Sequence, residues 1–228
     1  ILNFGADFLE TWESPCEYAR SWAHNRKSKH PARFFHIEPR LSLTGANADL
    51  WLSNKPGSEA NIARAVLAEL VRLGRGESLS DDVRAQIAKL VKGVSLEAVC
   101  AESGVYRDKI LSAVNYLNEA KASLVLAGGA AASTADPLPL LVTVNLINLI
   151  LGNVGTTINL ALLRPATGGL AAISKLIKSM QEDKVKLLLV DGINPLFNLP
   201  SAFGFAEAMK MVEACFASED HKEGRKAF

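Results

Sequence analysis

The sequence has few cysteines and none of the spacings that hold metal clusters. Its three cysteines, Cys16, Cys100 and Cys215, stand far apart in a chain of 228 residues, and no Cys-x-x-Cys pair occurs. Iron–sulfur and zinc sites made by a single chain are usually built from such pairs, so we expect neither kind of site here. Each cysteine is instead expected to be a buried thiol.

The sequence also lacks an excess of charge of either sign. It carries 25 Lys and Arg against 24 Asp and Glu, which gives a formal net charge of +1. Two short basic clusters, at residues 26–33 and 222–226, are expected to be solvated ends of elements rather than binding surfaces. The charge balance therefore predicts no nucleic-acid partner and no attraction to an acidic membrane surface.

No apolar run is long enough to predict a membrane span. The most apolar stretch, residues 137–155, contains Asn145 and Asn148 and is interrupted at Gly152, so it predicts a buried helix. No signal peptide is recognisable, and the first residues have the pattern of a strand interior without an initiator Met. We expect the chain to be a piece of a longer protein.

Sequence patterns of catalysis are missing as well. The chain has no P-loop, no G-x-S-x-G, no H-E-x-x-H and no G-x-G-x-x-G. Its four histidines show no metal-ligand spacing, and His36, inside a predicted strand, is expected to be structural. The pair Gly128–Gly129 follows another predicted strand, where close packing is a simpler explanation than phosphate binding.

What the sequence does contain is an alternation of strands and helices. Strand-like runs cover residues 1–4, 32–37, 122–128 and 185–192, and residues 48–53 form a short apolar segment. Helical patterns cover residues 14–26, 58–73, 137–155 and 205–217, with room for a last strand beyond. The runs at 122–128 and 185–192 are continuously apolar, which is typical of parallel strands covered on both faces. We therefore predict a three-layer α/β fold with a mostly parallel sheet and helices on both faces.

A small helical insert interrupts this alternation at about residues 78–118. Three short amphipathic patterns lie there, two of them opened by Ser and an acidic residue, and they are expected to pack against the sheet. Residues 1–228 as a whole are predicted to be one domain that includes this insert.

A weak sequence similarity between the beginning and the end of the chain predicts two related halves. Gly5 and Gly192 each follow an apolar run, and Asp7 and Asn194 each come two residues after that glycine, before a helix start. Two such loops would lie at the carboxyl ends of strands, where open α/β sheets bind ligands. The alternative is that any strand–helix unit needs a Gly turn and a helix cap.

The connection between residues 37 and 59 carries the strongest candidate site. Glu38 and Arg40 follow directly after a predicted strand, where an acid can bind a ribose or a base and an Arg can bind a phosphate. Pro56 and Gly57 form a turn that leads into a helix N-terminus, whose free N–H groups favour an anion. Glu59 can serve this site or simply cap the helix.

Four stretches resemble motifs of the molybdopterin oxidoreductase superfamily, the dimethyl sulfoxide reductase and formate dehydrogenase group. "NFGADFLETWESPCEYAR" resembles a first Gly-x-Asn-Pro loop, and "HIEPRLSLTGANADLWLSNKPGSE" resembles a segment that runs from acid-Pro-Arg to Pro-Gly-Thr-Asp/Glu. "VNLINLILGNVG" resembles a segment that ends in Gly-Asn-x-Gly, and "LLVDGINPLFNLP" resembles a second Gly-x-Asn-Pro loop. These motifs cover most of the chain.

Within the superfamily, the first two stretches most resemble the molybdopterin-like iron–sulfur subunit of alternative complex III. That resemblance implies a retained fold without a molybdenum cofactor, in a complex that passes electrons from quinol to a cytochrome or a similar acceptor. It implies partners that are other subunits of a membrane-associated redox complex. The compartment stays open, with the periplasmic side as one alternative. Iron–sulfur clusters are expected only in parts of the parent protein outside this chain.

The resemblance also assigns cofactor-binding residues, position by position. In cofactor-binding relatives the matching loops wrap the guanine-dinucleotide end of a pterin cofactor, molybdopterin guanine dinucleotide. The assigned residues are Gly5, Asp7, Glu38, Arg40, Pro56, Gly57, Glu59, Gly192, Asn194 and Pro195. Phe8 departs from the usual Pro and Ser58 from the usual Thr, and the segment that would ligate the metal is absent from this chain. No catalytic or metal-binding residue is predicted, and this fragment alone is not expected to be catalytic.

Three interpretations remain open at this point. The first is a domain of an electron-transfer subunit that keeps the fold and has lost the cofactor. The second is the nucleotide-binding module of a genuine molybdenum or tungsten bis-pterin oxidoreductase. The third is an unrelated α/β nucleotide-binding domain, for which binding of an ordinary dinucleotide would be the deciding observation.

Overall fold

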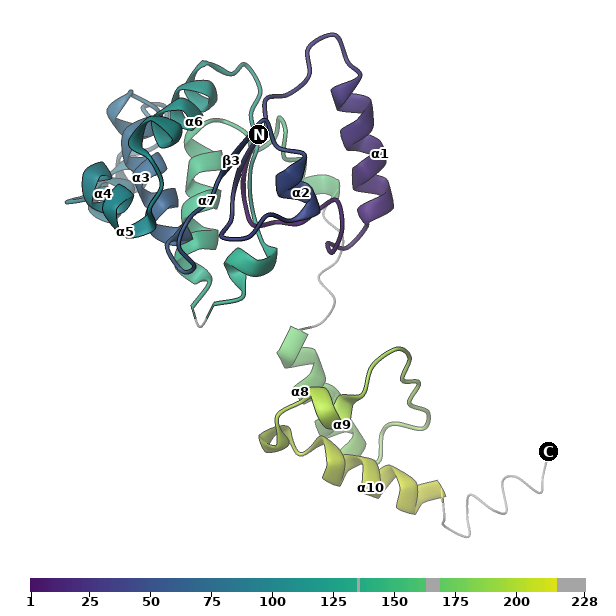
Figure 1. Cartoon of the computed structure of the whole chain (residues 1–228). Coiled ribbons are helices and arrows are strands. Elements are labelled where there is room, and N and C mark those ends of the chain that lie inside the picture. The colour runs from purple at the N-terminus through teal and green to yellow at the C-terminus, as the bar shows by residue number, and fades with distance from the viewer. Residues whose placement is uncertain (135, 163–168, 217–228) are drawn as a thin grey trace. The chain divides into compact units, whose positions relative to one another are not determined.

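The computed structural model describes residues 1–134, 136–162 and 169–216, and the chain divides into two compact units, Ile1–Leu162 and Leu163–Phe228 (Figure 1). Each unit is described by itself. The first is an α/β fold with a four-stranded parallel sheet, and the α-helices of the described residues are α1 to α10. The assignment of residues 1–228 to one domain and the relation between two halves stay predictions.

The sheet forms from the first four apolar runs. Its strands are β1 (Leu2–Phe4), β2 (Phe35–Ile37), β3 (Leu50–Leu52) and β4 (Val125–Ala127), in the order β3-β2-β1-β4. All three neighbouring pairs are parallel, with Leu2 opposite Phe35 and Val125. The strands predicted at residues 1–4, 32–37 and 122–128 are confirmed, and the short apolar segment 48–53 contains β3.

Alternating side chains of the strands enter two apolar clusters on the two faces of the sheet. The larger cluster takes Leu2, Phe4, Phe35, Ile37, Leu52 and Val125, together with side chains of the helices from α3 to α7. On the other face, Phe34 packs against Phe8 and Trp22, with ring centroids 5.7 and 5.1 Å apart. Asn3 and His36, between the apolar strand positions, are both fully buried.

The helices of the first unit largely follow the sequence patterns. They are α1 (Pro15–Arg26), α2 (Leu43–Ala46), α3 (Glu59–Arg72), α4 (Asp81–Val91), α5 (Leu96–Ser103), α6 (Arg107–Glu119) and α7 (Leu138–Ile150), with short 3-10 turns η1 (Gly129–Ala132) and η2 (Leu160–Leu162). Ser14 occupies the N-cap of α1, but its side chain makes no capping hydrogen bond. The three helical patterns of residues 78–118 form α4, α5 and α6, which pack on α3 and contribute to the larger cluster; that they are an insert stays a prediction.

The outer edge of β4 is closed by the helix that follows it. Leu124 O and Gly128 N bond to β1, so the N–H and C=O of Val125 point to the other side. Asn148 of α7 binds both groups, accepting from Val125 N at 3.0 Å and donating to Val125 O at 2.8 Å. Asn153 in turn donates to Asn148 Oδ1 at 2.8 Å. Asn148 therefore caps the outward-facing groups of Val125, and Asn153 of the Gly-Asn-x-Gly segment supports Asn148.

The second unit contains α8 (Gly169–Gln181), α9 (Pro195–Asn198), the 3-10 turn η3 (Ser201–Phe203) and α10 (Phe205–Phe216). Ile177, Met180, Phe205 and Ala208 form its small core. The strand predicted over residues 185–192 is wrong for this chain: those residues form a loop without strand pairing (Figure 1). The last strand predicted beyond α10 lies outside the described residues.

Two cysteine predictions also fail. Cys16 is exposed on α1, and Cys100 on α5 is only half-buried, although it packs against the larger apolar cluster. The side chain of Cys215 lies outside the described residues. None of the helices in the described ranges is long and apolar enough to cross a bilayer. Within those ranges, no group of three His, Cys, Asp or Glu side chains is placed to hold a metal ion.

Candidate functional site

Candidate residues of the first unit gather at the carboxyl edge of the sheet, where β1, β2 and β3 end. Open parallel sheets bind ligands at this edge because the loops after the strands meet there. Asp7 follows β1, Glu38 follows β2, and Glu59 begins the helix that follows β3. The exposed fractions of these three side chains are 3%, 1% and 3%, so all three carboxylates are buried.

The turn after β1 is held by Asn3 and needs glycine. Asn3 Nδ2 donates to Ala6 O at 2.7 Å, and Ala6 N donates to Asn3 Oδ1 at 3.1 Å. Gly5 has φ +65°, and a Cβ there would lie 2.7 Å from the Cβ of Ala131 in η1. A Cβ on Gly129 would likewise collide with Gly5 O. The two loops after β1 and β4 therefore pack directly on each other, which confirms close packing as the reason for the Gly pair.

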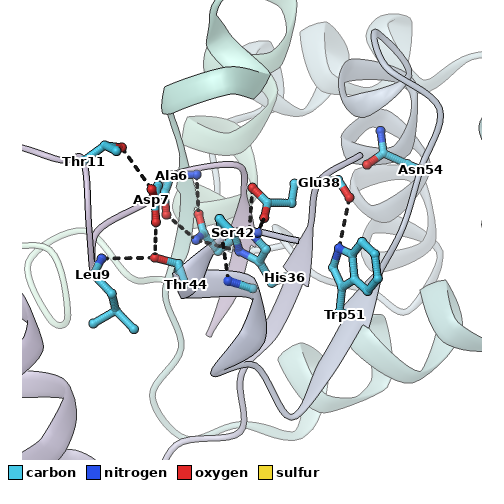
Figure 2. Close-up of polar contacts among 12 residues, drawn as sticks. Ala6, Asp7, Leu9, Thr11, His36, Glu38, Ser42, Thr44, Trp51 and Asn54 are labelled. Carbon is cyan, nitrogen blue, oxygen red and sulfur yellow. Dashed lines mark hydrogen bonds and ion pairs between the residues drawn. The ribbon is translucent and has the colours of Figure 1, made fainter. Parts of the chain in front are cut away.

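Asp7 is bound on both carboxylate oxygens by threonines. Thr44 Oγ1 donates to Asp7 Oδ1 at 2.6 Å, and Thr11 Oγ1 donates to Asp7 Oδ2 at 3.0 Å (Figure 2). Leu9 N donates to Thr44 Oγ1 at 3.0 Å, so the hydroxyl of Thr44 joins α2 to the loop after β1. Asp7 thus connects two loops of the protein and has both oxygens engaged.

Glu38 is engaged in the same internal way. Its Oε1 accepts from Ser42 N at 2.6 Å, and its Oε2 lies 3.2 Å from Nε2 of His36, an ion-pair distance that does not meet hydrogen-bond geometry (Figure 2). Ser42 Oγ then accepts from Gly45 N at 3.0 Å as the N-cap of α2. Glu38 therefore fixes the chain between β2 and α2.

The tautomer of His36 follows from its neighbour. The two bonds of Asn3 to Ala6 orient its amide, so Asn3 Nδ2 is the donor to His36 Nδ1 at 2.9 Å. The ring proton must then lie on Nε2, facing Glu38. Burial lowers the pKa of His36 below its usual value, and the nearby carboxylates of Glu38 and Asp7 oppose that shift. The ring is therefore a neutral part of the network, and the structural role predicted for His36 is confirmed.

The start of α3 combines an internal network with an exposed turn. Asn54 Nδ2 donates to Ser58 Oγ and to Glu59 Oε1, each at 3.0 Å. Pro56 and Gly57 are exposed, and Gly57 has φ +85° with free space where a Cβ would stand. Asn54 Oδ1 is buried and has no hydrogen-bond partner within the described chain.

Of the remaining candidates, Arg40, Gly192 and Asn194 are exposed and Pro195 is half-buried. Arg40 lies on the surface just after β2. In the second unit, Gly192 is exposed with φ +66°, Asn194 caps α9 by accepting from Phe197 N at 3.3 Å, and Pro195 is the first residue of that helix. The structure brings Gly5, Asp7 and Glu38 together, and the loop of the second unit stands in a separately described part of the chain.

Several residues that build this edge were not predicted from the sequence. They are Asn3, Ser42, Thr44 and Asn54. A signal for Asn3 exists, because an Asn inside an otherwise apolar strand must find buried partners. Ser42, three residues before Gly45, is an ordinary N-cap signal that the longer motif obscured.

Comparison with known proteins adds relationships to this geometry. No protein-family model matches the chain. The chain is 26% identical over 228 residues to "Menaquinone reductase, molybdopterin-binding-like subunit" of Nitratidesulfovibrio vulgaris, an alignment that covers 93% of this chain and 33% of that protein. The fold resembles acetylene hydratase from Pelobacter acetylenicus with a TM-score of 0.56, at 15% identity, covering 67% of this chain and 21% of that one.

By sequence, the chain is a distant relative of a protein described as a molybdopterin-binding-like subunit. It spans about a third of the length of the curated relative that it matches. The likeness to acetylene hydratase concerns the fold alone. The assignment of the ten cofactor-binding residues stays a prediction.

Proposed function

We propose that this chain is the molybdopterin-oxidoreductase-type α/β domain of a respiratory redox-complex subunit, a scaffold that takes part in electron transfer without binding a pterin cofactor itself. The observation that carries the proposal is the similarity, along 93% of the chain, to a subunit named molybdopterin-binding-like. Its partners are then other subunits of a membrane-associated complex, with iron–sulfur clusters in other parts of the assembly.

The internal bonds of the carboxylates support a scaffold. Asp7, Glu38 and Glu59 are buried, and each accepts hydrogen bonds from side chains or backbone of the same unit. A carboxylate that binds a ribose or a guanine must present an oxygen to the ligand. Each carboxylate keeps acceptor capacity, since one oxygen can accept two hydrogen bonds, but the three side chains are only 1–3% exposed. A nucleotide reaches them only after the loops that cover them move, so the arrangement as it stands favours a scaffold.

A second function is favoured by one specific observation. Asn54 Oδ1 is a buried acceptor without a partner, at the beginning of α3 beside the exposed turn at Pro56 and Gly57. A ligand that carries a donor would satisfy it, and the exposed guanidinium of Arg40 could hold an anionic group. The alternative function is therefore the nucleotide-binding module of a molybdenum or tungsten bis-pterin oxidoreductase.

Metal and pterin analysis of the full-length protein separates the two functions. The protein is made in a host that synthesises the cofactor, and molybdenum, tungsten, iron and oxidised pterin are measured against protein. Iron without pterin or molybdenum supports the scaffold. Metal near one-to-one and pterin near two-to-one with protein would overturn it and support the enzyme module.

Arg40→Ala tests the alternative more finely. If the chain binds a guanine nucleotide, we expect this variant to weaken GDP binding by about tenfold or more, because a charge-assisted bond to phosphate is lost. Isothermal titration of the 228-residue chain measures the change, with Arg72→Ala as control because Arg72 is exposed at the far end of α3. Equal affinity of wild type and Arg40→Ala would remove Arg40 from the site.

A further inference from the structure

A strongly basic segment covers the second half of α1 and the loop that leads to β2. Residues 20–33 contain five Lys and Arg and no Asp or Glu, whereas the other residues of the chain include 20 Lys and Arg and 24 Asp and Glu. The exposed basic side chains of this segment, here called the basic patch, are Arg20, His24, Arg26, Lys27, Lys29, His30 and Arg33. The patch produces a local positive field on a chain that is nearly neutral as a whole.

The structure holds the loop of the basic patch against α1, which the sequence did not indicate. Ala32 N donates to Asn25 Oδ1 at 3.0 Å, so the loop folds back on the end of the helix. Arg26 pairs with Asp49 at 3.0 Å, and its guanidinium lies 5.2 Å from the ring centre of Trp22. The patch therefore has a fixed shape, and fixed groups lose less entropy when a partner binds.

Three side chains of the basic patch form a stripe along α1. Arg20, His24 and Lys27 are spaced four and three residues apart, which places them on one face of the helix. Together with Ser21 they line a depression, and Glu17 lies at its start. This depression offers several donors to an anionic group.

An apolar cavity of about 280 Å³ lies on the other side of Ser21, between α1 and the sheet. Figure 1 shows α1 on the side of the sheet opposite to α3 and α7. The cavity is lined by Phe8, Trp12, Tyr18 and Trp22, and by the half-buried Leu124 and Leu126 at β4. Trp12 and Tyr18 contact each other with ring centroids 5.8 Å apart, so the aromatic lining is already in place.

The depression and the cavity adjoin, because Ser21 lines both. An apolar recess beside a charged rim is the usual arrangement of a protein–protein interface, in which one anchoring side chain fills the recess. Pockets for small organic ligands typically measure about 300–1,000 Å³. The cavity is slightly smaller than that range, which suits one large side chain.

We infer that the basic patch and the cavity form a docking surface for an acidic segment of a partner protein, which inserts one aromatic side chain between α1 and β4. Charge complementarity selects the acidic segment. An anionic membrane fits less well, because apolar side chains that enter a bilayer project from the surface, whereas those of the cavity line a recess. The inference goes beyond the proposed function and does not depend on whether a pterin cofactor is bound.

Peptide titration of the 228-residue chain by calorimetry tests the inference. The probe is Glu-Glu-Glu-Phe-Glu-Glu-Glu, here called the acidic Phe peptide; one control peptide has Ser in place of Phe, and another has Lys in place of every Glu. At low salt we expect the acidic Phe peptide to bind at least about tenfold more tightly than either control, because burial of the ring adds to the charge attraction. Equal affinities for Phe and Ser, or no binding at all, would overturn the inference.

The tryptophan indole signals in NMR spectra locate the bound peptide. Trp12 and Trp22 line the cavity, so their signals should shift during the titration. Trp51 is an internal control, because it lies in β3 at the opposite edge of the sheet, where its Nε1 donates to Glu38 O at 3.0 Å. A shift of Trp51 without shifts of Trp12 and Trp22 would contradict binding at the cavity.

Two other classes of partner are tested on the same chain. The probes are vesicles of phosphatidylcholine with phosphatidylglycerol, and a short oligodeoxythymidylate. We expect neither to bind as tightly as the acidic Phe peptide. Tighter binding of the vesicles would make the patch a membrane contact, and tighter binding of the oligonucleotide would make it a nucleic-acid contact; either result overturns the inference.

A charge-reversing double variant adds a side-chain test. Arg20→Glu with Lys27→Glu is expected to weaken binding of the acidic Phe peptide by about tenfold or more and to allow the Lys control peptide to bind. Lys175→Glu with Lys178→Glu, at exposed positions of α8, changes the net charge equally and should leave both affinities unchanged. All four positions are exposed, so both variants are expected to fold. A comparable loss in the two variants would show that net charge alone matters and would refute a specific docking surface.

Discussion

The stretches 1–7 and 185–194 share a local sequence plan and fold differently. Each has an apolar run, then a glycine with φ near +65°, then an Asp or Asn two residues later. The first run becomes the buried strand β1, in which Leu2 and Phe4 are fully buried. The second run stays a loop in which Leu187 and Leu189 are mostly exposed.

The difference lies in the neighbours rather than in the residues. β1 has a strand on each side: Leu2 N donates to Leu124 O beside β4, and Phe35 N of β2 donates to Ile1 O. The second run has no paired strand within the described chain. Whether an apolar run forms a strand therefore depends on whether neighbouring strands are present to bond with it. A local sequence preference for strand is not sufficient by itself.

The largest expected effect is a difference in the free energy of unfolding between a substitution in the first run and one in the second. Phe4→Ala is expected to lower the free energy of unfolding of the first unit by about 3–5 kcal/mol, because a fully buried aromatic ring leaves a cavity. Leu189→Ala is expected to change it by less than about 0.5 kcal/mol. Urea unfolding followed by Trp fluorescence measures Phe4→Ala, since Trp12, Trp22 and Trp51 all lie in the first unit, and far-UV circular dichroism, which follows the helices of both units, measures both variants. A comparable loss in both variants would contradict the comparison.

Much of the first unit could be predicted from periodicity and helix signals. The runs around Phe4, Phe35 and Val125 are short and apolar, and the helical pattern over residues 58–73 forms α3. These are local signals that the tertiary structure agrees with. The strand at residues 185–192 could not be decided in this way, because an apolar run does not say whether a pairing edge exists for it.

The candidate site could also be predicted only in part from the sequence. The sequence identified Asp7 and Glu38 as polar residues at strand ends, and the structure places both there. The sequence did not identify Thr44 and Ser42 as the groups that bind these carboxylates. Thr44, which binds Asp7, lies in α2, 37 residues further along the chain, and Ser42 binds Glu38 through its backbone N–H. Burial and hydrogen-bond partners depend on which loops meet, and spacing along the chain does not encode that directly.

A smaller loss of stability is expected when the edge of β4 loses its cap, the pair of hydrogen bonds between Asn148 and Val125. Asn148→Ala is expected to lower the free energy of unfolding by about 2–3 kcal/mol, because the buried N–H and C=O of Val125 lose their partner. Asn145→Ala is the matched control on the same helix: its amide is exposed and bonds only to Leu141 O. It should change stability by less than about 0.5 kcal/mol. Equal effects of the two substitutions would refute an edge cap at Asn148.

The smallest effect concerns the buried His36, which has no counterpart at residues 185–194. Its pKa in the folded protein is lowered by burial, so below its ordinary pKa of about 6.5 the unfolded chain takes up a proton that the folded chain does not. Stability attributable to His36 is therefore complete above about pH 6.5 and declines as the pH falls, by at most about 1.4 kcal/mol per pH unit. Urea unfolding between pH 7.5 and 5.5 measures this slope.

The control for that slope is a histidine on the surface of the same unit. His24→Gln on the exposed side of α1 should leave the slope unchanged, whereas His36→Gln should flatten it. Nitrogen NMR of the ring checks the cause directly: Nδ1 should be the unprotonated nitrogen, because it accepts from Asn3, and Nε2 should carry the proton. A proton on Nδ1 would require a reversed Asn3 amide, and the turn at Gly5 would then lose both bonds between Asn3 and Ala6 that close it.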